Sequence, residues 1–159
     1  MLKNRGFTLI ELLMVITIIG ILSTVVLVAL NNARIRGVDA ATKADVVGIR
    51  GAAELYYTIF PDAYGNTTAF INTTCGAAGT ANSVSIDPKV QAQIDGAILK
   101  NGGFEAKCAG APTWYVIAVP LKSNTANGWC VDSGGRSIQI LMVNFSTNTD
   151  STCILANTP

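Results

Sequence analysis

The chain has 159 residues, of which 50% are hydrophobic and 13% are charged, and its formal net charge is +1. This length fits one domain of ordinary size, and this charge gives no broad basic field that would capture nucleic acid. The sequence contains no histidine, so it lacks the usual general base, the usual metal ligand and the usual activator of a serine or cysteine. We therefore expect no enzyme, no metal site and no cofactor.

The hydrophobic residues are concentrated near the N-terminus. Lys3 and Arg5 lie in a short basic segment, and residues 7–30 then contain a single formal charge, at Glu11. As a helix this run would be about 36 Å long, enough to cross a hydrocarbon core of about 30 Å. The two preceding cations place the N-terminus in the cytoplasm and send the rest of the chain across the membrane. The alternatives are an ordinary secretory signal peptide, whose apolar core is shorter, and an uncleaved anchor.

An amphipathic pattern continues this apolar run. One stripe of residues recurs at intervals of three and four, as on one face of a helix. It consists of Ile35, Val38, Thr42, Val46, Ile49, Ala53, Tyr56 and Phe60. Pro61 ends the pattern, because the residue before a proline avoids the helical conformation. The sequence predicts one helix from Phe7 to Phe60, apolar all round in residues 7–30 and amphipathic in residues 31–60.

Two pairs of opposite charges lie in the amphipathic segment. Asp39 precedes Lys43 by four residues, and Arg50 precedes Glu54 by four residues. Side chains at this spacing are neighbours on a helix surface, so the sequence predicts two ion pairs.

The segment that begins at Pro61 differs in amino-acid composition from the predicted helix. Residues 61–85 are rich in Thr, Asn, Gly, Ala and Ser, which predicts an exposed loop around Cys75. Asp87 followed by a proline is typical of a helix N-terminus, and the glycines at 102–103 stop the pattern that follows. We expect a short helix from about Asp87 to Lys100.

The remaining residues predict an antiparallel sheet. Residues 113–119 and 137–143 are rich in β-branched and aromatic residues, and residues 129–131 form a shorter strand. Asn127-Gly128 and residues 133–136 predict the turns that precede and follow this short strand. The apolar face of such a sheet needs cover, which the stripe on the long helix supplies. The fold class is therefore α+β, with a protruding apolar half-helix and an amphipathic half packed on a small sheet.

Three further features have an ordinary interpretation. Asp132 and Asp150 suggest a calcium loop, but without the EF-hand spacing we expect solvated turn residues. Glycosylation triplets begin at Asn66, Asn72 and Asn144, and we interpret them as coincidences in polar segments. Aromatic residues that can stack on bases or sugars lie in strand-like runs, where core packing is expected. They are Trp114, Tyr115 and Trp129.

All four cysteines lie beyond the apolar run. They are Cys75, Cys108, Cys130 and Cys153, and no two of them form a C-x-x-C motif. An even number on the far side of a membrane segment predicts two disulfides in an oxidising compartment, and four free thiols are the alternative. Three connectivities exist, and the residues alone do not select one.

Residues 3–11, with the sequence KNRGFTLIE, resemble the leader and cleavage site of type IV pilins and of the related pseudopilins of type II secretion. The resemblance implies that a membrane peptidase cuts after Gly6 and that the new amine of Phe7 is methylated. Glu11 matches the glutamate that the family has at the fifth position of the processed chain. Val28 departs from the pattern, because many pilins have a proline there.

The resemblance also implies an organisation of the whole chain. Residues 1–6 would be the leader, 7–30 the membrane and filament-core segment, 31–60 the amphipathic half of the same helix and 61–159 a globular head. The implied partners are copies of the chain in a helical filament, the prepilin peptidase and an inner-membrane assembly machinery. The subunit would sit in the cytoplasmic membrane before assembly and in an extracellular filament afterwards.

Glu11 needs a physical explanation beside this resemblance. A carboxylate within a membrane costs at least about 2.5–3.5 kcal/mol on insertion scales, so it should have a partner. No basic residue lies between Phe7 and Ala33. Cleavage after Gly6 would create the α-amino group of Phe7, about one helical turn from Glu11. Glu11 would pair with this amine in its own chain or in a neighbour, and the second choice would fix an axial stagger between helices.

The implied function is that of a structural subunit of a type IV pilus-like filament. The alternatives are a type II secretion pseudopilin and a minor pilin that binds DNA or a surface at the filament tip. Loss of Lys3 and Arg5 with the leader changes the formal side-chain charge from +1 to −1, which disfavours nucleic acid. Many pilins staple a C-terminal loop to their sheet, so the resemblance favours Cys130–Cys153 and, by elimination, Cys75–Cys108.

Overall fold

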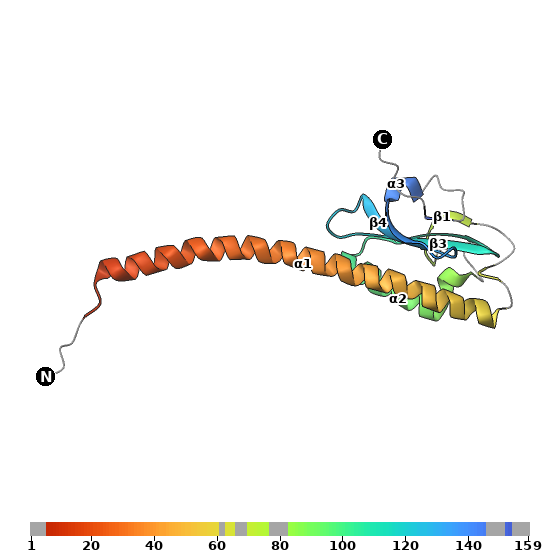
Figure 1. Ribbon diagram of the computed structural model, residues 1–159, viewed down its shortest axis with the longest axis horizontal. Helices are drawn as coiled ribbons and strands as arrows, with labels where there is room; N and C mark the ends of the chain where they lie inside the picture. The colour runs from red at the N-terminus through yellow and green to blue at the C-terminus, as the bar shows by residue number, and fades with distance from the viewer. Residues whose placement is uncertain (1–5, 61–62, 66–69, 77–82, 146–151, 154–159) are drawn as a thin grey trace. The chain divides into compact units, whose positions relative to one another are not determined.

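The computed structural model divides the chain into two units, residues 1–36 and residues 37–159. It describes residues 6–60, 63–65, 70–76, 83–145 and 152–153. The first helix, α1 (Leu9–Ile59), begins in the first unit and ends in the second (Figure 1). Its bounds lie within two residues of the expected ones, so the prediction of one uninterrupted helix is confirmed.

The second unit combines the end of α1 with a five-stranded antiparallel sheet, so the α+β prediction is confirmed. Its strands follow one another in chain order across the sheet (Figure 1). The elements after α1 are β1 (Phe70–Thr74), the 3-10 helix η1 (Val84–Ile86), α2 (Pro88–Asn101), β2 (Lys107–Ala111), β3 (Trp114–Pro120), β4 (Asn127–Asp132), β5 (Ser137–Leu141) and α3 (Met142–Phe145).

One face of the sheet packs against α1 and α2. The predicted stripe supplies the contacts from α1, with Val46, Ile49 and Ala53 fully buried in the main core. Ile94 of α2 and Ile117 of β3 belong to the same cluster. Burial of this stripe stabilises the second unit, because each large aliphatic side chain removed from water contributes roughly 1.5–3 kcal/mol.

A second apolar cluster covers the opposite face. Val116 of β3 and Ile140 of β5 pack there with Phe145 of α3 and with Cys153. Successive residues of a strand point to opposite faces, so β3 contributes Val116 to this cluster and Ile117 to the main core. Figure 1 shows α3 across the sheet from α2. The sequence did not predict this second layer.

Two of the five strands were also not predicted. Part of the expected loop 61–85 forms β1, and β2 follows it in the sheet. β2 has the sequence KCAGA, which lacks the β-branched and aromatic residues that mark a strand. Its conformation is set by pairing with β3, where Cys108 lies opposite Ile117.

The prediction of a turn at Asn127-Gly128 is wrong. Both residues lie in β4, and the turn before them closes with a hydrogen bond from the Asn127 N–H to the Asn124 carbonyl. A Cβ on Gly128 would meet the Met142 side chain of α3 and would lie 3.1 Å from the Val119 carbonyl oxygen, so a larger residue here would displace Met142 and press on β3. The expected strand 137–143 ends at Leu141, where α3 begins.

The predicted ion pairs of α1 do not form among the described residues. Asp39 is buried and accepts hydrogen bonds from the backbone N–H groups of Lys122 and Ser123, at 2.8 and 3.3 Å. Lys43 lies over the ring of Trp129, 4.7 Å from its centroid. These side chains attach the helix to the sheet and its β3–β4 loop.

The second predicted pair is also replaced by longer-range contacts. Arg50 donates to the Gly135 carbonyl at 3.0 Å, and Glu54 accepts from the Tyr64 hydroxyl at 3.0 Å. Burial raises the pKa of Tyr64 to about 12, and the hydrogen bond to Glu54 adds to the rise. The hydroxyl therefore stays protonated and keeps donating to Glu54 near neutral pH.

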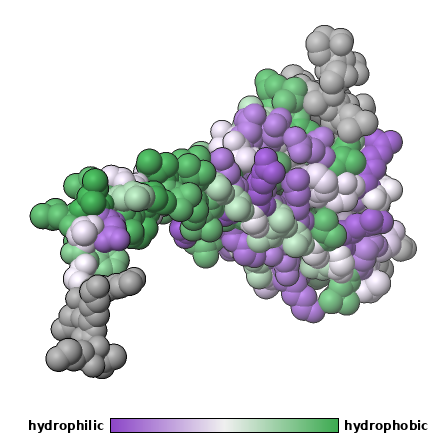
Figure 2. All heavy atoms as spheres, turned by 60° about the vertical axis from the view of Figure 1, so that its left-hand side comes forward, coloured by the Kyte–Doolittle hydropathy of each residue, from purple (hydrophilic) through white to green (hydrophobic). Residues whose placement is uncertain are grey.

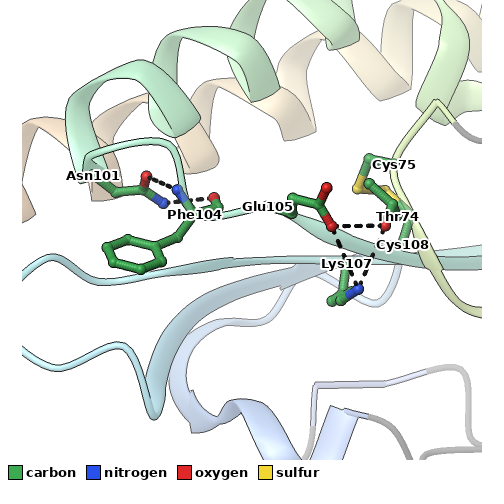
Figure 3. A network of polar contacts seen from close by, with 7 residues as sticks. All are labelled: Thr74, Cys75, Asn101, Phe104, Glu105, Lys107 and Cys108. Carbon is green, nitrogen blue, oxygen red and sulfur yellow. Dashed lines mark hydrogen bonds and ion pairs between the residues drawn. A yellow bond between two sulfur atoms is a disulfide. The ribbon is translucent and has the colours of Figure 1, made fainter.

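The predicted capping of α2 is confirmed. Asp87 accepts from the N–H groups of Lys89 and Val90, and Gly102 has φ +106° after the last turn. Asn101 is fully buried at this end, and its side chain forms hydrogen bonds with the backbone of Phe104 (Figure 3). It also accepts from the Gly103 N–H and donates to the Pro120 carbonyl.

Candidate processing and assembly site

The Gly6–Phe7 peptide bond precedes the first turn of α1. Both side-chain positions are exposed, and the Phe7 side chain is 80% exposed. A Cβ added to Gly6 would meet nothing within 4 Å. Among the described residues, nothing shields this bond or restricts the size of the side chain at position 6.

Thr8 and Glu11 form a reciprocal cap at the start of α1. The Glu11 carboxylate oxygen Oε2 accepts from the Thr8 backbone N–H at 3.0 Å and from its hydroxyl at 2.7 Å. The Glu11 N–H donates to Thr8 Oγ1 at 3.3 Å. This is the capping box of the T-x-x-E pattern, which satisfies two N–H groups that the helix cannot pair itself. Thr8-Leu9-Ile10-Glu11 carried this signal, and the sequence reasoning missed it.

The cap holds the Glu11 carboxylate at Thr8, the residue after Phe7. Cleavage after Gly6 would turn the Phe7 nitrogen into an amine one residue before Thr8. Both hydrogen bonds use Oε2, which leaves Oε1 without a partner among the described residues. A carboxylate accepts several hydrogen bonds, so Glu11 can keep the cap and still take a cation.

The first part of α1 presents an apolar surface on all sides. Every residue from Gly6 to Arg34 is exposed in this unit. On the face seen in Figure 2 the hydrophobic colour predominates in this segment, with a hydrophilic patch near its start. Among the described residues, α1 is the helix long and apolar enough to cross a membrane, with a mean hydropathy of 2.8 in its most apolar window.

Three hydroxyl groups in this apolar segment bond to their own helix. Thr17 donates to the Met14 carbonyl, and Thr24 donates to the Ile21 carbonyl, both at 2.8 Å. Ser23 donates to the carbonyl four residues before it, at 2.7 Å. Polar groups satisfied within the helix suit an apolar surrounding, where an unpaired donor would cost several kcal/mol.

The cysteines are joined in the two pairs that the resemblance favours. Cys75 is bonded to Cys108 beside the contacts of Thr74 with Glu105 and Lys107 (Figure 3). The second bond joins Cys130 to Cys153. The Cys75–Cys108 disulfide packs with the main core, and the Cys130–Cys153 disulfide belongs to the apolar cluster on the opposite face of the sheet.

Non-reducing peptide mapping of the exported protein checks this pairing. We expect one crosslinked peptide pair containing Cys75 and Cys108 and another containing Cys130 and Cys153. In the chain-entropy model, closing a loop of the second size contributes about 3 kcal/mol to stability. A Cys75–Cys130 or Cys108–Cys153 crosslink, or four free thiols, would contradict the assignment.

Asp132 is not the solvated turn residue expected from the sequence. It is fully buried, and its two carboxylate oxygens accept from the N–H groups of Arg136 and Cys153, both at 2.8 Å. Arg136 in turn donates to the Cys153 carbonyl at 3.3 Å. The carboxylate therefore closes the β4–β5 turn and fastens the disulfide-bonded C-terminal segment to it. Asp150 and the glycosylation position Asn66 lie outside the described residues.

Asp132→Asn is expected to lower the free energy of unfolding by about 1–3 kcal/mol, because one buried N–H would then face an amide donor. Denaturation of the full chain in detergent, with disulfides intact, measures this through Trp114 and Trp129 fluorescence. Glu105→Gln is the control, since it alters an exposed ion pair worth at most about 1 kcal/mol. Equal stability of the Asp132→Asn variant and the wild type would contradict the fastening role.

Residues 1–27 match a protein-family model described as the prokaryotic N-terminal methylation motif. The chain carries this methylation motif. The match includes the Gly6–Phe7 junction and Glu11, so the resemblance seen in the sequence is confirmed for this part of the chain. No curated protein and no solved structure matches the chain.

The methylation motif supports a precursor of the type IV pilin or pseudopilin type. It points to a structural subunit, and it implies processing by a prepilin peptidase and assembly into a pilus-type filament. The apolar start of α1 fits anchoring in a membrane before assembly. The motif covers only the first part of the chain and gives no information about the second unit.

Proposed function

We propose that this chain is a structural subunit of a type IV pilus-like filament, cleaved after Gly6, methylated at Phe7 and polymerised through α1. One observation carries the proposal: the methylation motif opens an uninterrupted helix whose residues 9–34 are all exposed and whose residues 9–30 carry one formal charge, at Glu11. Such a surface needs lipid or other helices around it, because a soluble monomer rarely exposes a patch of this extent.

Cleavage would supply the assembly signal. It removes Lys3 and Arg5, which hold the N-terminus in the cytoplasm, and it creates a cation at Phe7. The capping box holds the Glu11 carboxylate at the same helix end. In lipid an unpaired charge is costly, so each subunit gains by bringing its Glu11 to a Phe7 amine of a neighbour. That pairing fixes one axial stagger, and the apolar surfaces then pack in a dry filament interior.

The second unit supplies the filament surface in this proposal. Its sheet is covered on both faces, and its two disulfides suit an oxidising exterior. The negative charge of the processed chain and the engagement of its strand aromatics in packing favour a structural role over DNA capture.

Electron microscopy of filaments sheared from the cell surface, with identification of their subunit, tests the proposal. Filaments composed mainly of this chain support it. A trace amount in filaments made of another subunit would instead assign it as a minor pilin, and short filaments confined to the periplasm would assign it as a pseudopilin.

A further inference from the structure

Two arginines follow the apolar segment of α1 directly. Arg34 and Arg36 lie in the first unit, and both are exposed. Among the described residues, neither side chain has a hydrogen-bond or ion-pair partner. We propose that they bind the phosphate groups of anionic phospholipids, in the leaflet at the C-terminal end of the apolar segment. The inference rests on the proposed insertion of this segment in a membrane before assembly.

The height of the arginines along the helix agrees with a headgroup contact. Leu9 to Leu30 would span about 33 Å of helix, close to a hydrocarbon core of about 30 Å. Arg34 then lies about 6 Å beyond the end of that run and Arg36 about 9 Å beyond it. The headgroup layer extends roughly 5–8 Å on each side of the core, so flexible arginine side chains reach its phosphates.

The two arginines point in different directions, which favours lipid over a single docked protein as their binding partner. Positions two residues apart on a helix point about 200° apart, so Arg34 and Arg36 lie on opposite sides of α1. A protein docked on one side would meet one of them, whereas lipids surround a membrane helix. A guanidinium also suits this contact, because its fork of donors binds phosphate oxygens in pairs.

None of the acidic side chains that the structure describes is paired with Arg34 or Arg36. Every acidic side chain that the structure describes already accepts a hydrogen bond or forms an ion pair. These residues are Glu11, Asp39, Asp45, Glu54, Asp87, Asp95, Glu105 and Asp132.

The test measures which lipids surround the helix. The full chain is reconstituted in phosphatidylcholine vesicles with trace spin-labelled phosphatidylglycerol or phosphatidylcholine, and electron spin resonance gives the motionally restricted fraction of each. All variants carry Lys3→Gln and Arg5→Gln, which removes the leader cations. The test variant adds Arg34→Gln and Arg36→Gln. The matched control adds Lys89→Gln and Lys122→Gln, two cations of the second unit.

We expect the background chain and the control to prefer phosphatidylglycerol, on the order of fivefold for one cation at the headgroup level. The test variant should show no preference, and sodium chloride should weaken that of the background chain. Equal preference in the test variant and the background, or an equal loss in the control, would overturn the inference. The inference would also be overturned if inorganic phosphate weakened the preference for phosphatidylglycerol more than sodium chloride of the same ionic strength does. That result would show that the arginines bind free phosphate.

The same spectra separate this inference from the proposed function. A restricted component without lipid preference would show an inserted helix and overturn only the role of the arginines. The absence of a restricted component for either label would show that α1 does not insert, which contradicts the membrane stage of the proposed function as well.

Discussion

A Gly6→Val variant is expected to accumulate as uncut precursor, with the Phe7 nitrogen still in a peptide bond and therefore unmethylated. The peptidase implied by the methylation motif must accommodate the residue before the cut, and a β-branched side chain there is larger and stiffer than glycine. The substitution should not disturb the chain itself, because a Cβ at this position meets nothing within 4 Å.

Gly6→Ala is the matched control, since it adds one methyl group at the same place. It should be cut at a measurable rate, while Gly6→Val should lose at least nine-tenths of its processing. Electrophoretic separation of precursor and mature chains in membranes gives both yields. Wild-type processing of Gly6→Val would contradict a peptidase that requires a small residue before the cut.

Glu11→Ala should leave a folded, membrane-inserted subunit that is largely absent from filaments. The substitution removes the charge and the capping box together. A lost helix cap costs about 1 kcal/mol, which α1 can tolerate because its second half is held by the main core. Loss of the charge removes the partner of a neighbouring Phe7 amine. The interaction that fixes the axial register of the helices is then also lost.

Two further variants separate these effects. Glu11→Gln keeps a capping-box side chain without the charge, and Thr8→Val removes the hydroxyl while keeping the charge. We expect Glu11→Gln to assemble as poorly as Glu11→Ala, and Thr8→Val to assemble nearly as well as the wild type. The yield of sheared filaments in strains that carry only the variant measures this. Full recovery in Glu11→Gln would show that Glu11 acts through the cap alone.

The long helix was predictable because its pattern extends over many turns. The stripe from Thr42 to Tyr56 repeats at helical spacing, and Pro61 marks its end. β2 was not predictable in this way, because its residues are small and its partner strand determines its conformation. The second apolar layer also depends on tertiary contacts, since Phe145 and Cys153 reach it from short or irregular segments.

The residues of the candidate site also differ in whether local sequence or only the fold reveals their role. Glu11 was visible in the sequence because a single acidic residue in a membrane segment is a distinctive local pattern, whereas Gly6 and Phe7 were named through the resemblance of residues 3–11 to the pilin leader. The Thr8–Glu11 cap was equally local, and the T-x-x-E spacing could have revealed it. The role of Asp132 was not accessible, because its partner Cys153 is 21 residues away and only the fold brings them together.

The intact mass and N-terminal sequence of the subunit in sheared surface filaments test the central claim most directly. We predict a chain that begins at Phe7, carries one added methyl group on its amine and lacks residues 1–6. The two disulfides should lower its mass by four hydrogens relative to the reduced chain. A filament subunit that begins at Met1, or that begins at Phe7 with an unmodified amine, would contradict the proposed processing.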